Sequence, residues 1–158
     1  MTSERLTHLD DEGHARMVDI TEKSVAVRKA TATARVRMAE STIALLRNGR
    51  LPKGDALAVA RVAGIMAAKR TPELIPLCHP IAIHGVEVEL FIRDDTVDIT
   101  ATVRTADRTG VEMEALTAAS ISALTIIDMI KGVDRLAFVE ALQVESKEGG
   151  RSGTWVRP

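Results

Sequence analysis

The sequence predicts an α+β domain built from an antiparallel sheet with helices packed on one face. Residues 31–38, 85–93 and 97–104 alternate between apolar and polar side chains, which is typical of strands with one buried face. Residues 110–132 form one long, mostly apolar run of helix-favouring residues without proline. A chain of 158 residues is long enough to bury a core within one domain.

The composition is typical of a soluble protein without a nucleic-acid or membrane partner. The formal net charge of −1 gives no overall attraction to nucleic acid or to an anionic membrane. An aromatic content of 2% argues against recognition by base stacking. No apolar run at the start resembles a signal peptide and no segment approaches the roughly 18 apolar residues of a membrane span, so we expect a cytoplasmic protein.

The first part of the chain is predicted to be less ordered than the rest. Residues 1–16 are polar and unpatterned, so we expect a flexible N-terminal tail followed by a single domain over residues 17–158. A short apolar anchor at 17–20 leads into a basic stretch that contains Lys23 and Arg28.

A strand and two helices are predicted next. In the strand 31–38, the alternate residues Ala32, Ala34, Val36 and Met38 face the core. A short helix begins at Ser41 and is stopped by Asn48 and Gly49. A second helix covers residues 56–69, with Asp55 as its N-cap.

The only cysteine, Cys78, lies beside His79 in a segment, residues 71–80, that contains three prolines. A single cysteine excludes an internal disulfide and a cysteine-based zinc cluster, and no other ligand spacing indicates a metal site. The prolines predict a rigid loop that presents these two side chains. Cys78 could act as a nucleophile only beside a base, and the alternative is a connector with a buried cysteine.

A hairpin and a final strand complete the predicted sheet. Strands 85–93 and 97–104 flank a tight turn at Asp94 and Asp95, and a last strand covers residues 137–145.

The long helix 110–132 is predicted to be central and mostly buried, because apolar residues surround its middle. Glu112 and Glu114 lie in its first turn, and Gly132 is a candidate C-cap. Asp128 and Lys131 are three positions apart, so their side chains can touch. Spacing alone favours a structural ion pair at the rim of the core; the alternative is an acid/base pair in a pocket.

Two further segments are candidates for anion binding. Lys53 precedes the N-terminus of the helix 56–69, where an anion site and a solvated lysine are both plausible. The glycine-rich C-terminal segment 147–155 carries Lys147 and Arg151 and would let backbone N–H groups approach a phosphate. Composition alone favours a frayed linker there.

The element order is strand, two helices, hairpin, long helix and strand, which predicts a ferredoxin-like fold. In this fold the helices cover one face of the sheet and leave the other face open. The open face would carry Arg35, Arg37, Glu87, Glu89, Thr100, Thr102 and Arg104.

Five segments, in this order, resemble the MoaC family. They are residues 53–55, 67–71, 74–80, 110–120 and 128–131, and the resemblance extends over roughly residues 14–155. It implies a lyase of molybdenum cofactor biosynthesis that converts 3′,8-cyclo-7,8-dihydro-GTP to cyclic pyranopterin monophosphate and releases pyrophosphate. It also implies a homohexamer, a trimer of dimers, with the site at a subunit interface.

The resemblance implies roles for individual residues. Asp128 and Lys131 match the catalytic acid/base pair. The family's substrate-contacting segments are matched by Leu77, Cys78, His79, Met113 and Glu114. Its catalytic or phosphate-contacting cations are matched by Lys53, Arg28, Lys23 and Lys147. Arg151 stands where the family has lysine, and a guanidinium suits a phosphate clamp rather than a proton donor. No cofactor is implied beyond magnesium accompanying the substrate's triphosphate.

Two other functions are compatible with the same residues. One is a non-catalytic, oligomeric small-molecule-binding module, since a ferredoxin-like fold does not by itself imply catalysis. The other is a structural oligomer in which Asp128 and Lys131 form only an interface salt bridge.

Overall fold

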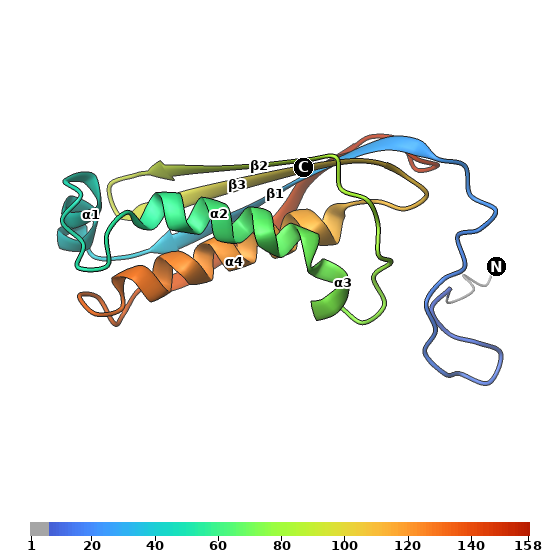
Figure 1. Ribbon diagram of the computed structural model, residues 1–158, viewed down its shortest axis with the longest axis horizontal. Helices are drawn as coiled ribbons and strands as arrows, with labels where there is room; N and C mark the ends of the chain where they lie inside the picture. Colours follow the sequence, from blue (N-terminus) through green and yellow to red (C-terminus); the bar gives the residue numbers. More distant parts are fainter. Residues whose placement is uncertain (1–6) are drawn as a thin grey trace.

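The computed structural model describes residues 7–158, and its centre is a five-stranded antiparallel sheet in the order β2-β3-β1-β4-β5 (Figure 1). The strands are β1 (Ala26–Arg37), β2 (Gly85–Ile92), β3 (Thr96–Asp107), β4 (Phe138–Glu148) and β5 (Trp155–Val156). The helices are α1 (Glu40–Arg47), α2 (Ala56–Lys69), α3 (Thr71–Leu74) and α4 (Glu112–Ile130). The order of the first four strands and the helices α2 and α4 over one face confirm the predicted ferredoxin-like α+β fold.

Small side chains bring α4 close to the sheet. The inward residues of β1 include Ala30, Ala32 and Ala34, all almost fully buried, and α4 presents Ala115 and Ala119 in the same core. Alanine against alanine lets the backbones approach closely, and the larger Ile and Val side chains fill the core around them. The alternation predicted for this strand is confirmed.

Helix α4 is the buried helix that the sequence predicts. The expectation that no segment approaches a membrane span is wrong, because α4 is long and apolar enough to cross a membrane, but 56% of that stretch is buried inside the protein. Gly132 is not its C-cap, and that prediction is wrong. Lys131 caps the helix instead, and the N–H groups of Val133 and Asp134 both donate to the carbonyl of Ile130 at 2.9 Å. Because the chain continues in a right-handed turn, no left-handed glycine is needed.

Element boundaries differ from prediction where polar residues enter strands. β1 begins at Ala26, opposite Asp107 of β3, so the basic stretch with Arg28 is part of the sheet. β4 continues to Glu148, and β5 pairs with it, so the C-terminus returns to the sheet instead of fraying. The predicted loop 71–80 opens with the short helix α3, which Pro72 starts.

The N-terminal segment runs beyond the end of the sheet (Figure 1). Residues 1–6 of the predicted flexible tail lie outside the described residues. Leu9 and Ala15 form an isolated bridge, and the carboxylate of Asp10 accepts the backbone N–H of His14 at 2.8 Å. The flexibility of this tail stays a prediction.

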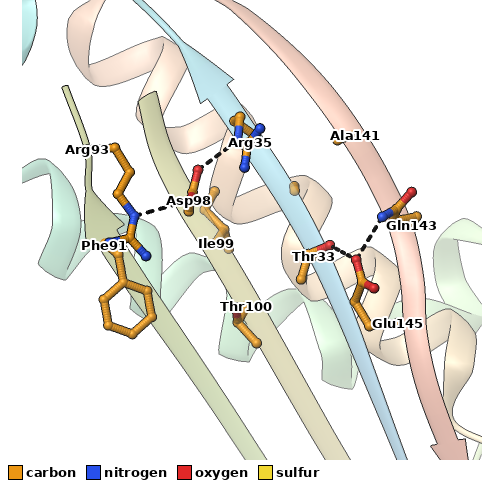
Figure 2. A pocket seen from close by; sticks show the side chains of 11 residues that line it. Thr33, Arg35, Phe91, Arg93, Asp98, Ile99, Thr100, Ala141, Gln143 and Glu145 are labelled. Carbon is orange, nitrogen blue, oxygen red and sulfur yellow. Dashed lines mark hydrogen bonds and ion pairs between the residues drawn. The ribbon is translucent and has the colours of Figure 1, made fainter. Parts of the chain in front are cut away.

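Most of the charged groups on the open face of the sheet pair with one another. Arg35 donates to Asp98 at 2.8 Å, and Arg93 donates to the other oxygen of Asp98 at 3.3 Å (Figure 2). On the neighbouring strands, Glu145 accepts hydrogen bonds from Thr33 and Gln143. The shallow cavity of about 380 Å³ over these residues therefore presents paired groups.

Candidate active site

The predicted site residues gather at the two ends of α4. Asp128 and Lys131 lie at its C-terminal end, whereas Met113 and Glu114 lie in its first turn. Glu114 and Asp128 are fourteen positions apart, which corresponds to roughly 21 Å along a helix at 1.5 Å per residue. One chain therefore carries two separate groups of candidate residues.

At the C-terminal end, Asp128 is held between two lysines. Nζ of Lys131 lies 2.7 Å from Oδ1 of Asp128, and Nζ of Lys53 lies 2.9 Å from Oδ2. The predicted contact between Asp128 and Lys131 is confirmed. Hydrogen bonds from Lys131 and then Lys53 lower the pKa of Asp128 to about 2, so this carboxylate is ionised at neutral pH. The side chain is 53% exposed, which leaves it accessible to a substrate.

Local backbone geometry brings Lys53 to this position. Gly54 turns the chain with a φ of 90°, and the Asp55 carboxylate then accepts the N–H of Ala58 at 3.0 Å as the predicted N-cap of α2. Nζ of Lys53 also donates to the backbone carbonyl of Asp128 at 2.9 Å. The last carbonyls of a helix lack intrahelical partners and carry partial negative charge, so a lysine is stabilised there.

At the N-terminal end, three predicted cations surround one cleft. Lys23, Arg28 and Arg151 line a cavity of about 610 Å³, together with the carboxylates of Asp19 and Glu22. Nε of Arg28 donates to the carbonyl of Asp107 at 2.9 Å, which holds this guanidinium near the start of β1 and the end of β3. The cleft can therefore receive an anion, with the two carboxylates restricting its approach.

Lys147 lies beside this cleft and forms an ion pair. Its Nζ lies 3.2 Å from Oε1 of Glu112 and donates to the hydroxyl of Ser152 at 3.3 Å. From the sequence, Glu112 was predicted only to complement the helix dipole, and this contact with Lys147 was not predicted. A side chain at Gly110 would lie 2.0 Å from the Glu112 carboxylate, so the glycine makes room for it.

The rigid loop meets the first turn of α4 at a buried carboxyl group. Glu114 is 3% exposed, and burial, with a further contribution from Glu112, raises its pKa to about 7. Burial, and then the nearby Glu114, raises the pKa of the Cys78 thiol. An activated nucleophile needs the opposite shift, so the environment disfavours Cys78 as a nucleophile.

The other predicted substrate-contacting residues also lie near the N-terminal end of α4. Nε2 of His79 lies 2.6 Å from the carbonyl of Val18, which fixes the ring against the N-terminal segment. Leu77 and Met113 are both partly exposed at this end. Within residues 7–158, no group of three or more His, Cys, Asp or Glu side chains is placed to hold a metal ion.

Comparison with known proteins identifies the family. A family model described as the MoaC family matches residues 17–150. A cyclic pyranopterin monophosphate synthase of Streptomyces griseus is 61% identical over 156 residues, which cover 99% of this chain and 88% of the relative. Proteins of the same name from a Nocardioides species and from Chloroflexus aurantiacus are 60% and 57% identical, over 98% and 97% of this chain and 96% and 95% of those relatives. The chain belongs to the MoaC family.

Proposed function

We propose that this protein is a lyase that converts 3′,8-cyclo-7,8-dihydro-GTP to cyclic pyranopterin monophosphate and releases pyrophosphate, as a step of molybdenum cofactor biosynthesis. The observation that carries the proposal is the exposed Asp128 carboxylate between Lys53 and Lys131. Relatives similar over nearly their whole length, and named for this product, support it. Because the substrate derives from GTP, we expect a cytoplasmic enzyme.

The Asp128 cluster suits proton transfer. The Asp128 carboxylate is ionised, but the hydrogen bonds from its two lysines make it a weak base, so it accepts a proton only after the substrate has replaced one of them, and the ammonium group of Lys131 is the proton donor. Rearranging the purine ring of the substrate requires such transfers. Asp128 and Lys131 are the residues we assign to them, and Lys53 positions the carboxylate.

The cationic cleft suits the triphosphate. A hydroxyl oxygen of the substrate attacks its own α-phosphate, which closes the cyclic phosphate, loses the hydroxyl proton and expels pyrophosphate. Fixed cations and hydrogen-bond donors stabilise the developing negative charge. Lys23, Arg28, Lys147 and Arg151 supply them, and Arg151 can grip a phosphate with two parallel hydrogen bonds. The proposal needs no resident cofactor, because magnesium can arrive with the triphosphate.

The two groups of residues complete one site when two protomers meet. Proton-transfer groups act within about 3 Å of the reacting atoms, far less than the length of α4. Exposed apolar side chains flank both groups: Leu136 is 89% exposed beyond the Asp128 end, and Val27 is 75% exposed beside the cleft. We place the site at a protomer interface of a homo-oligomer, and a hexamer assembled as a trimer of dimers satisfies this requirement.

Pyrophosphate release from the cyclised intermediate tests the activity. We expect release by the wild type and none by Asp128→Asn with its fold intact. Release by both proteins would leave the lyase in place but make Asp128 structural. Saturable binding without release by either would support a non-catalytic binding module, and no binding would favour a purely structural oligomer.

Complementation between inactive variants tests the shared site. Asp128→Asn and Lys147→Ala should each be inactive alone, since each removes one half of the site. Mixed in equal amounts and allowed to exchange subunits, they should recover about a quarter of wild-type activity, because half of the dimers then hold one intact site. No recovery despite proven exchange would place both residues in one chain's site.

A further inference from the structure

We propose that Arg157, on the C-terminal side of β5, is a positioning residue that holds the loop 149–154 so that Arg151 and Lys147 face the phosphate cleft. The inference rests on the proposed function, because it assigns this loop to the substrate's phosphates. Arg157 itself lies outside the cleft and acts through the loop backbone.

Arg157 fastens the C-terminal end of the chain to β4. Its backbone N–H donates to the carbonyl of Glu145 at 2.8 Å, and its Nε donates to the carbonyl of Val144 at 2.8 Å. Its guanidinium carbon lies 5.6 Å from the centre of the Trp155 ring, a cation–π contact. A strand of two residues is too short to be stable through its ladder alone, so these contacts keep it paired.

The other side of the loop is fitted tightly to β1. Gly149 and Gly150 have φ angles of 91° and 76°, in the left-handed region that favours glycine. A side chain on Gly149 would lie 2.2 Å from the carbonyl of Val27, and one on Gly150 would lie 2.1 Å from the guanidinium of Arg28. The loop can therefore approach β1 this closely only with glycine at these two positions. Because glycine backbones are flexible, contacts elsewhere must hold the loop in place.

The side chain of Arg151 depends on that restraint. Among the described residues, no hydrogen bond or ion pair holds its guanidinium, although it lines the cleft with Lys23 and Arg28. Its position is therefore set by the loop backbone alone. Lys147 is coupled to the same anchor, because it pairs with Trp155 across the β4–β5 ladder.

Steady-state kinetics of pyrophosphate release test the proposal. We expect Arg157→Ala to raise KM for the cyclised intermediate about tenfold, which is about 1.4 kcal/mol of binding, with kcat changed far less. Pyrophosphate should inhibit this variant less strongly. Arg157→Lys keeps the charge but not the planar guanidinium, so we expect an intermediate KM. An unchanged KM in Arg157→Ala would overturn the proposal.

Limited digestion with trypsin gives a readout that does not depend on activity. Cleavage after Arg151 should be faster in Arg157→Ala, because the loop opens more often, whereas equal cleavage rates would overturn the proposal. Arg47→Ala is a matched control, since Arg47 also donates to a backbone carbonyl, that of Arg93 at 3.0 Å, far from the cleft. It should change neither KM nor this cleavage.

The two proposals fail in distinguishable ways. A wild type that releases no pyrophosphate refutes the proposed function, while the digestion still decides whether Arg157 restrains the loop. If Arg157→Ala does not fold, Arg157→Lys decides through the same measurements: a wild-type KM together with wild-type cleavage would refute the positioning role.

Discussion

Nζ of Lys131 lies 2.7 Å from Oδ1 of Asp128, one helical turn away on the same face of α4. Both side chains are more than half exposed, and ion pairs of such exposure contribute little to stability. Spacing alone favoured a structural pair at the rim of the core. The observed exposure leaves the pair little stabilising effect and makes both groups accessible, which fits the acid/base role proposed above, and Lys53 contacts the same carboxylate.

Replacing Asp128 with asparagine should therefore affect chemistry and not folding. We expect turnover to fall by about 10²- to 10⁴-fold, as for loss of a general acid or base, with an unchanged thermal unfolding midpoint. Glu87→Gln is a matched control because Glu87 pairs with Arg104 at 3.3 Å on the open face of the sheet. Equal activity of the two variants would show that Asp128 takes no part in the reaction.

Glu114 should make stability depend on pH. Its folded-state pKa of about 7 lies above the ordinary 4.5, so between these pH values the folded protein holds a proton that the unfolded chain releases. The free energy of unfolding should therefore fall as pH rises from about 4.5 to 7, by up to about 3 kcal/mol. Denaturant unfolding at pH 5 and pH 8 measures this change.

The comparison is with Glu114→Gln, whose neutral amide does not titrate. Other groups contribute to the pH profile in both proteins, so the decisive quantity is the difference between them. The variant should lose less stability than the wild type between pH 5 and pH 8. Identical losses would mean that Glu114 is ionised in the folded protein at both pH values.

The sequence predicts the elements that have strong local patterns. A period of two residues predicts β1 and the hairpin. A period of 3.6 residues predicts the extent of α2 and the buried helix α4. The start of β1 was missed because Arg28 and Lys29 carry no apolar alternation, and only pairing with β3 makes them a strand. β5 was missed because two residues after a glycine-rich run give no periodic signal.

Much of the site depends on contacts that spacing does not encode. The three-residue interval predicted the contact between Asp128 and Lys131, but Lys53 is 75 positions from Asp128 and arrives there only through the fold. Family resemblance pointed to both residue groups without showing that α4 holds them roughly 21 Å apart within one chain. The contact of Lys147 with Glu112 likewise required β4 and α4 to be placed together.

Asp134 should stabilise the fold as a distant cap of α1. Ala39, at the N-cap position, has no side-chain oxygen, and the Asp134 carboxylate accepts its N–H at 2.8 Å and the Thr42 hydroxyl at 3.1 Å. We expect Asp134→Ala to lower the free energy of unfolding by about 1–2 kcal/mol and Asp134→Asn by less. In urea unfolding, Asp94→Ala serves as control, because Asp94 is exposed and its one ion pair among residues 7–158 is with Arg47. Equal midpoints for both alanine variants would contradict the capping role.

The contact between α2 and α4 should tolerate nothing larger than glycine at position 64. A side chain there would lie 2.1 Å from Oγ of Ser122 and 3.0 Å from the carbonyl of Ala118, so Gly64→Ala should cost about 1–3 kcal/mol despite alanine's better helix propensity.

A double-mutant cycle separates this clash from other effects. Ser122→Ala removes the obstructing oxygen together with its hydrogen bond to the carbonyl of Ala60, and should cost about 1 kcal/mol alone. Combined with Gly64→Ala, it should destabilise the protein by less than the sum of the two single changes, because the alanine at position 64 then fills the space that Oγ leaves. Strict additivity in urea unfolding would show that the helices separate around the new methyl group instead of meeting it at Ser122.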